Sequence, residues 1–121
     1  MKSFKLNYIY DYDNDLADIT VNNDFRYKKS IELDKGIILD LDENCIPIAI
    51  ELISASKILG IDKKHLISPD INILIKVNNE LIKFEIKFTY FIHEDECDIF
   101  IKQNIANNYG IPSIETLLTT V

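Results

Sequence analysis

The stretch from Ser30 to Gly60, SIELDKGIILDLDENCIPIAIELISASKILG, decides much of the architecture of this chain. It reads as a strand, a tight turn, a strand and a short helix. A two-residue loop at 43–44 brings three apolar cross-strand pairs onto one face, and a slip of one residue would break all three. These pairs are Leu41–Ile46, Leu39–Ile48 and Ile37–Ile50. Pro47 cannot donate to a ladder, so this part of the strand is expected at a sheet edge.

A short helix and a second hairpin follow this stretch. Ser54 is placed as the N-cap of the helix, and Gly60 marks its end. In the second half, a loop at Asn78-Asn79 suits a type I′ turn, because Asn tolerates positive φ. This loop gives three apolar pairs on one face: Ile75–Ile82, Ile73–Phe84 and Ile71–Ile86.

The remaining segments are mostly strands by their alternation. Apolar residues recur with period two over 4–10 and 17–21, and Tyr27 to Leu33 reads as a short edge strand. In the tail, residues 114–121 carry apolar side chains at helical spacing, although 119–121 also suits a strand. We therefore expect an α+β fold, with antiparallel β-hairpins in one or two sheets, a short helix after the second hairpin and a short C-terminal helix.

Composition limits the domain organisation and the partners. The 121 residues make two small units, a hairpin and helix unit over 1–60 and a β-rich extension over 61–121, or a single domain over 1–121. The net charge of −7 repels a phosphate backbone, so we expect no nucleic-acid partner. No apolar run approaches the ~20 residues of a membrane span. Cys45 and Cys97 are too few for a disulfide framework, and we expect a cytoplasmic protein with free thiols.

Several short pieces together carry a family resemblance. They are Tyr10-Asp11, Asp15-Leu16 with Ile19, Ser30–Leu33, Gly36–Asp42, Ile50–Leu52 and Ala55-Ser56. In this combination the first half of the chain resembles the domain-of-unknown-function 2283 family. Ala49 and Ser54 depart from it, since Gly and an acid are usual there. The second half is similar to a β-rich extension of some archaeal members.

The resemblance implies a small α+β domain of hairpins and a helix. It implies no established activity and supplies no catalytic residues. Members are associated with small toxin-like proteins, which suggests an antitoxin-like role as one alternative. The residues themselves do not indicate an enzyme either. Glu51 lacks an evident catalytic partner, and His65 and His93 are solitary.

Two acidic runs are candidate metal ligands. Asp11, Asp13 and Asp15 alternate in the first turn, and Asp40 and Asp42 alternate in the central strand. Carboxylates so spaced can supply the oxygen ligands of a calcium-like cation, but neither run has the remaining parts of an EF-hand loop. Acids that shape turns are the simpler interpretation, and we expect no cofactor.

The strand from Glu80 to Ile92 outruns its hairpin partner, which leaves Phe88, Tyr90 and Ile92 without local cover. Such an overhang needs another strand or another subunit to pair with it. The segment that contains Ile99 and Ile101 is the local candidate for such a strand. The leading hypothesis is a non-catalytic protein-interaction module that self-associates, as a homodimer or with another protein partner. Divalent-cation binding and an antitoxin-like role are the alternatives.

Overall fold

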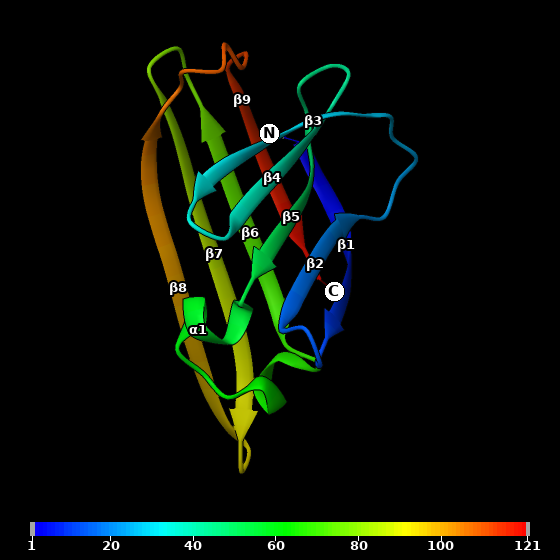
Figure 1. Cartoon of the computed structure of the whole chain (residues 1–121), viewed down its shortest axis with the longest axis vertical. Coiled ribbons are helices and arrows are strands. Elements are labelled where there is room, and N and C mark those ends of the chain that lie inside the picture. The colour runs from blue at the N-terminus through cyan, green and yellow to red at the C-terminus, as the bar shows by residue number, and fades with distance from the viewer. Residues whose placement is uncertain (1, 121) are drawn as a thin grey trace.

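The computed structural model describes residues 2–120 as nine strands and two short helices (Figure 1). In chain order the elements are β1 Lys2–Asp11, β2 Leu16–Val21, β3 Tyr27–Asp34, β4 Ile37–Asp42, β5 Pro47–Ile53, α1 Ala55–Leu59, the 3-10 helix η1 Lys63–Leu66, β6 Asp70–Val77, β7 Leu81–Ile92, β8 Asp95–Ala106 and β9 Ile114–Thr119.

All nine strands belong to one curled sheet in the order β3-β4-β5-β2-β1-β9-β6-β7-β8. The sheet forms a half-barrel, with β3, β4, β5 and β2 lying in front of β6, β7 and β8 in Figure 1. The two halves of the chain meet where β1 pairs with β9, in a parallel ladder. The boundary expected between residues 60 and 61 therefore falls between strands of one sheet that encloses one hydrophobic cluster.

The expected α+β class is wrong, because the structure is mostly β. The only α-helix among residues 2–120 is α1, which has five residues. The expected C-terminal helix is also wrong, since 114–119 forms β9 between β1 and β6. Thr116 and Leu118 alternate inward with period two, and β-branched threonines favour a strand where ladders lie on both sides.

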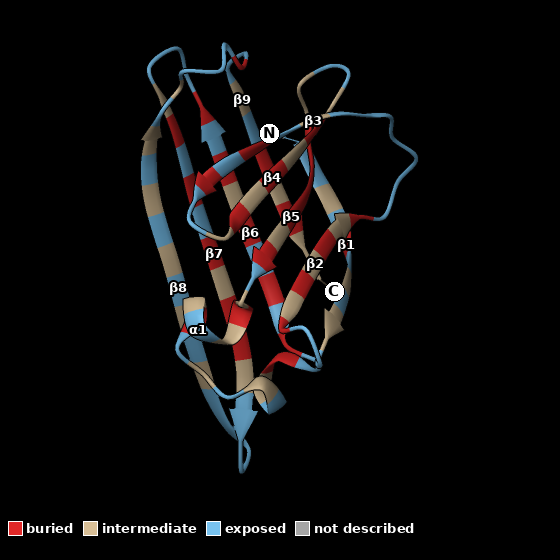
Figure 2. Cartoon of the chain, in the orientation of Figure 1, coloured by how far each residue is buried: buried red, intermediate tan, exposed pale blue. Residues whose placement is uncertain are grey.

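The concave face of the sheet holds the core. Figure 2 shows buried positions alternating with exposed ones along β6 and β7. Phe84 and Phe88 are the largest side chains that are fully buried there. The inward faces expected for residues 4–10 and 17–21 are confirmed. Period two therefore predicted the faces of these strands correctly.

Both hairpin registers differ from the expected ones. In the first hairpin, Leu39 pairs with Ile50 instead of Ile48, a shift of two residues, but beyond a bulge after Asp40 Leu41 pairs with Pro47 instead of Ile46, a shift of one. In the second, Ile73 pairs with Ile86 instead of Phe84. A slip of two residues keeps every side chain on its face, so the hydrophobic pattern could not detect it.

Local hydrogen bonds at the second turn account for its slip. The Asn78 side-chain oxygen accepts from the backbone N–H groups of Glu80 and Leu81, both at 2.8 Å. Asn78 therefore faces Leu81, which moves the loop to 79–80. Neither Asn78 nor Asn79 has positive φ, so the expected type I′ turn is not formed.

Of the two strands expected at a sheet edge, β5 is not an edge strand and β3 is one. β5 lies between β4 and β2, not at an edge. Pro47 is tolerated because it is the first residue of β5, beyond the last pair with β2 at Ala49. The edge strand expected over Tyr27 to Leu33 is confirmed as β3, which ends the sheet on one side.

Candidate functional site

The five candidate metal ligands lie at two separate places. Asp11, Asp13 and Asp15 lie in or beside the β1–β2 turn, at the lower end of the molecule in Figure 1. Asp40 and Asp42 lie on β4, towards the β4–β5 turn at the upper end. The structure therefore does not bring the two acidic runs together.

Four of these five carboxylates are bonded within the chain, and two of them organise turns. Asp11 accepts from the Asn14 side-chain amide at 2.8 Å, which helps to lower the pKa of Asp11. Asp42 accepts from the backbone N–H groups of Asn44 and Ile46 at 2.8 and 2.9 Å. Within residues 2–120 no three or more Asp, Glu, His or Cys side chains are grouped so as to hold a metal ion. A cation site stays a prediction that this arrangement does not favour.

Asp15 forms a polar latch with Tyr10 and Ser56. Its carboxylate accepts from the Tyr10 hydroxyl at 2.6 Å, the Ser56 hydroxyl at 2.6 Å and the Ser56 backbone N–H at 3.0 Å. The Asp15 backbone carbonyl also accepts from the Ala55 N–H at 2.9 Å. These bonds tie the β1–β2 turn to the start of α1, although Asp15 and Ser56 are 41 positions apart.

The latch changes the acidity of its members. Burial alone would raise the pKa of Asp15, but the bonds from Ser56 and Tyr10 outweigh it and hold the pKa below the usual range. Burial and the bond to Asp15 raise the pKa of the Tyr10 hydroxyl. The sequence does not reveal this network, because Ser56 lies 41 positions from Asp15.

A second cluster of carboxylates, made by Glu51, Asp18 and Asp40, lies on the outer face of the sheet. Glu51 on β5 stands beside Asp18 on β2, in the register set by the β2–β5 ladder. Partial burial raises the pKa of Glu51, and repulsion from Asp40 and Asp18 adds to the shift. His65 packs elsewhere, with its ring centroid 4.7 Å from that of Tyr90. Glu51 therefore has carboxylate neighbours, as on a solvated strand face.

The three residues expected at an interface lie in different surroundings. Phe88 is fully buried and makes an edge-on contact with Tyr8, whose ring centroid is 6.4 Å away. Tyr90 is half-buried against His65. Ile92 is exposed at the tip of the β7–β8 hairpin. Phe88 therefore belongs to the core. Of the three residues, Tyr90 and Ile92 are accessible to a partner.

The overhang of β7 is covered by β8 along its whole length. Leu81 faces Ala106 at one end of the ladder, and Ile92 faces Asp95 at the other. Ile99 and Ile101, the local candidates, do lie on this strand. A two-residue turn joins β7 to β8, and its central residues His93 and Glu94 both have positive φ, as a type I′ turn requires. The unpaired edge therefore moves outward from β7 to β8.

The outer edge of β8 is the most distinctive surface of the molecule. Among residues 2–120 no strand pairs with this edge (Figure 1). The strand has twelve residues and no proline, and its register with β7 has no bulge. Such an edge presents a row of unpaired backbone N–H and C=O groups, which is a template for another strand.

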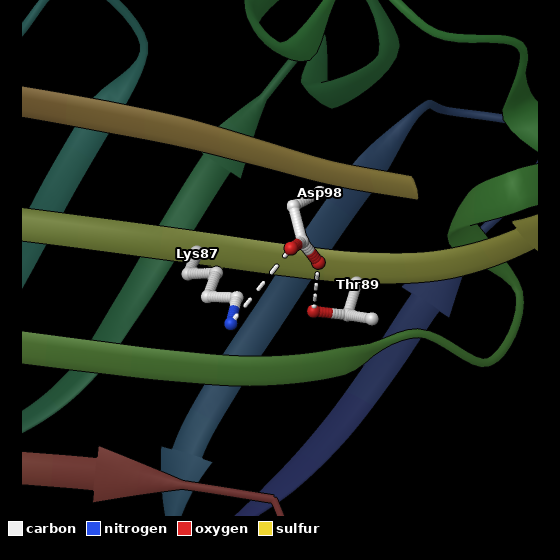
Figure 3. A network of polar contacts seen from close by, with 3 residues as sticks. All are labelled: Lys87, Thr89 and Asp98. Atoms are coloured by element: carbon white, nitrogen blue, oxygen red, sulfur yellow. Dashed lines mark hydrogen bonds and ion pairs between the residues drawn. The ribbon is translucent and has the colours of Figure 1, made fainter. Parts of the chain in front are cut away.

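Three side chains on the convex face of β8 form an acid–aromatic–base series. The Asp98 carboxylate accepts from the Thr89 hydroxyl at 2.7 Å and lies 3.9 Å from the Lys87 ammonium (Figure 3). Phe100 is 55% exposed, and the ammonium groups of Lys87 and Lys102 lie 5.8 and 5.4 Å from its ring centroid. Asp98, Phe100 and Lys102 thus stand at alternate positions on one face. The alternation of the sequence does not distinguish these three side chains, since it indicates only that the segment can cover β7.

Comparison with known proteins agrees with the resemblance seen in the sequence. The family described as "Protein of unknown function (DUF2283)" matches residues 7–56, which include the Tyr10–Asp15–Ser56 latch. An uncharacterized protein of Methanocaldococcus jannaschii, MJ0789, is 30% identical over 114 residues, covering 90% of this chain and 94% of its own length. The chain belongs to the DUF2283 family. No solved structure matches it. Within residues 2–120 no helix of this family member is long and apolar enough to cross a membrane.

Proposed function

We propose that this protein is a non-catalytic interaction module that self-associates through the outer edge of β8. The observation that carries the proposal is the unpaired twelve-residue edge of β8, which has neither bulge nor proline. Soluble proteins usually protect such an edge with short strands, bulges, prolines, charged side chains or a covering element. Of these devices β8 carries charged side chains alone, at Asp95, Glu96, Asp98 and Lys102. A second copy of the chain would satisfy the outward backbone groups of β8.

The side chains of β8 support a protein partner. Phe100 is a large exposed aromatic residue near the middle of the strand, and aromatic side chains contribute strongly to interface energies. A partner of different sequence, such as the small toxin that the family resemblance suggests, would use the same backbone groups. The measured mass of the complex formed by the pure chain separates the two cases.

The test is sedimentation velocity on the full chain over micromolar concentrations. We expect a reversible dimer in the wild type and a monomer in the variant Phe100→Lys, whose melting temperature should stay close to that of the wild-type monomer because the site is exposed. The matched control is Tyr27→Lys on the opposite edge strand, where the tyrosine is 59% exposed. This control should still dimerise. A wild-type chain that is monomeric throughout would overturn the proposal.

A further inference from the structure

We infer that the partner is a second copy of this chain, whose β8 adds antiparallel to β8 about a two-fold axis at Phe100. This inference rests on the proposed function and specifies its geometry. The axis falls near the middle of a strand that runs from Asp95 to Ala106, so nearly the whole edge pairs. An interface of this kind is self-complementary, because the same surface serves both copies.

The side chains of β8 are complementary in this register. Phe100 lies opposite the partner subunit's Phe100, and Asp98 lies opposite the partner subunit's Lys102. By symmetry, Lys102 lies opposite the partner subunit's Asp98, so two ion pairs flank the aromatic pair. Directly opposite residues of an antiparallel pair project to the same side of the sheet. All these side chains therefore meet on the convex face.

The concave face is matched as well. Ile99 lies opposite the partner subunit's Ile101, and Ile101 opposite the partner subunit's Ile99. Both isoleucines are half-buried in the single chain and already pack against its core. Pairing thus extends the apolar cluster of each copy along the open side of its half-barrel. Apolar cross-strand pairs of this kind stabilise antiparallel ladders.

Neighbouring registers lose this complementarity. An axis at Asp98 or at Lys102 would place two like charges directly opposite each other, which is destabilising. An axis at Ile99 would pair Glu96 with the partner subunit's Lys102, but it would place Asp98 opposite the aromatic ring of Phe100. An axis at Ile101 would place Asp98 opposite Asn104. Among these registers, only the axis at Phe100 pairs Asp98 with Lys102 and at the same time pairs the two phenylalanines.

The intrachain contacts of β8 hold these side chains ready for the partner. Thr89 donates to Asp98 and fixes the carboxylate on the convex face. Lys102 faces Glu85 across the β7–β8 ladder. In the dimer, the row Glu85, Lys102, the partner subunit's Asp98 and the partner subunit's Thr89 would run across four strands with its charges alternating in sign.

Cysteine cross-linking tests the register in a chain that carries Cys45→Ser and Cys97→Ser. Phe100→Cys should form a disulfide between copies under mild oxidation, because opposite Cα atoms lie about 4.5–5.5 Å apart, within disulfide reach. Glu96→Cys and Asn104→Cys are the matched controls, since all three sites are exposed. Neither control should cross-link alone, because each thiol is about 27 Å from its own symmetry mate. The two controls should cross-link when mixed.

The outcomes separate the register from the proposed function. Cross-linking at position 100, with the two controls reactive only in the mixture, supports the register. If the wild-type chain sediments as a dimer but neither Phe100→Cys nor the mixture of Glu96→Cys and Asn104→Cys, which keeps Phe100, forms a cross-link, the register is overturned and self-association stands. If the wild-type chain is a monomer, the register and the proposed function both fail.

Discussion

The two edges of the sheet are built in opposite ways. β3 has eight residues, and its ladder with β4 shifts register twice, between Tyr27 and Lys29 and between Glu32 and Asp34. β8 has twelve residues and keeps one register with β7 throughout. Bulges turn backbone groups away from the line of the edge and so discourage strand addition. In the proposed dimer, this difference is the reason that the partner strand adds to β8 and not to β3.

The same two edges also meet within the molecule. The Gln103 side-chain amide on β8 donates to the Asp34 carboxylate at 2.6 Å, at the end of β3. This bond lowers the pKa of Asp34, as does the bond from the Lys35 backbone N–H. The half-barrel is therefore bridged on its concave side, while the backbone groups along the outer edge of β8 stay unpaired.

The largest expected effect comes from removing the core support of β8. Phe88→Ala should lower the free energy of unfolding by about 3–5 kcal/mol, because it leaves a cavity in the core beneath β7, the strand with which β8 pairs. Phe100→Ala, at an exposed site, should change the same quantity by less than about 0.5 kcal/mol. Urea denaturation of the monomer measures both.

Association should respond to the two aromatic residues in a different way. Phe100→Ala is expected to weaken the dimer while the monomer keeps its stability. If Phe100→Ala destabilised the monomer as much as Phe88→Ala, Phe100 would be part of the fold and not a surface held for a partner.

A smaller effect is expected at the latch, which lies in the layer that carries β3. Ser56→Ala removes the hydroxyl donor to Asp15, and a loss of about 1–3 kcal/mol is expected for a buried charged acceptor. Association through β8 should not change. Asp13→Asn, in the same turn, is the control and should have little effect on stability. A latch variant that abolished the dimer would contradict the expectation that the latch and the β8 edge act independently.

The latch also predicts a pH dependence with a definite sign. The pKa of Asp15 is lower in the folded chain than in the unfolded chain, so its contribution to stability is fully present above the unfolded pKa. The contribution is lost as the pH falls through the folded pKa. Asp15→Asn should therefore flatten the acid limb of the stability profile, measured by thermal melts from pH 7 downward. An unchanged acid limb would contradict the role given to Asp15.

Period two and turn residues predicted the strand faces, the β3 edge and the position of α1. They could not predict the registers, because a slip of two residues keeps each face and the decisive Asn78 bonds are local details. The tail over 114–119 was misread because a short apolar segment suits either helix or strand until its neighbours β1 and β6 are known.

The site was harder to predict than the fold. Asp15 resembled a cation ligand until its partner Ser56, distant in sequence, was placed beside it. Phe88 on β7 and Phe100 on β8 both lie in segments whose side chains alternate between the two faces of the sheet. Phe88 faces the core, and Phe100 faces away from it. Only the pairing of β8 with β7, which sets the face from which each side chain projects, shows that Phe100 is left at the surface.

Amide hydrogen exchange at the two edges, followed as protein concentration rises, tests the central claim most directly. Unpaired edge amides exchange fast, and amides that join a ladder are protected. We predict that protection over 95–106 in β8 rises with concentration, while protection over 27–34 in β3 does not change. Exchange at β8 that is independent of concentration, or protection gained at β3 instead, would contradict the account.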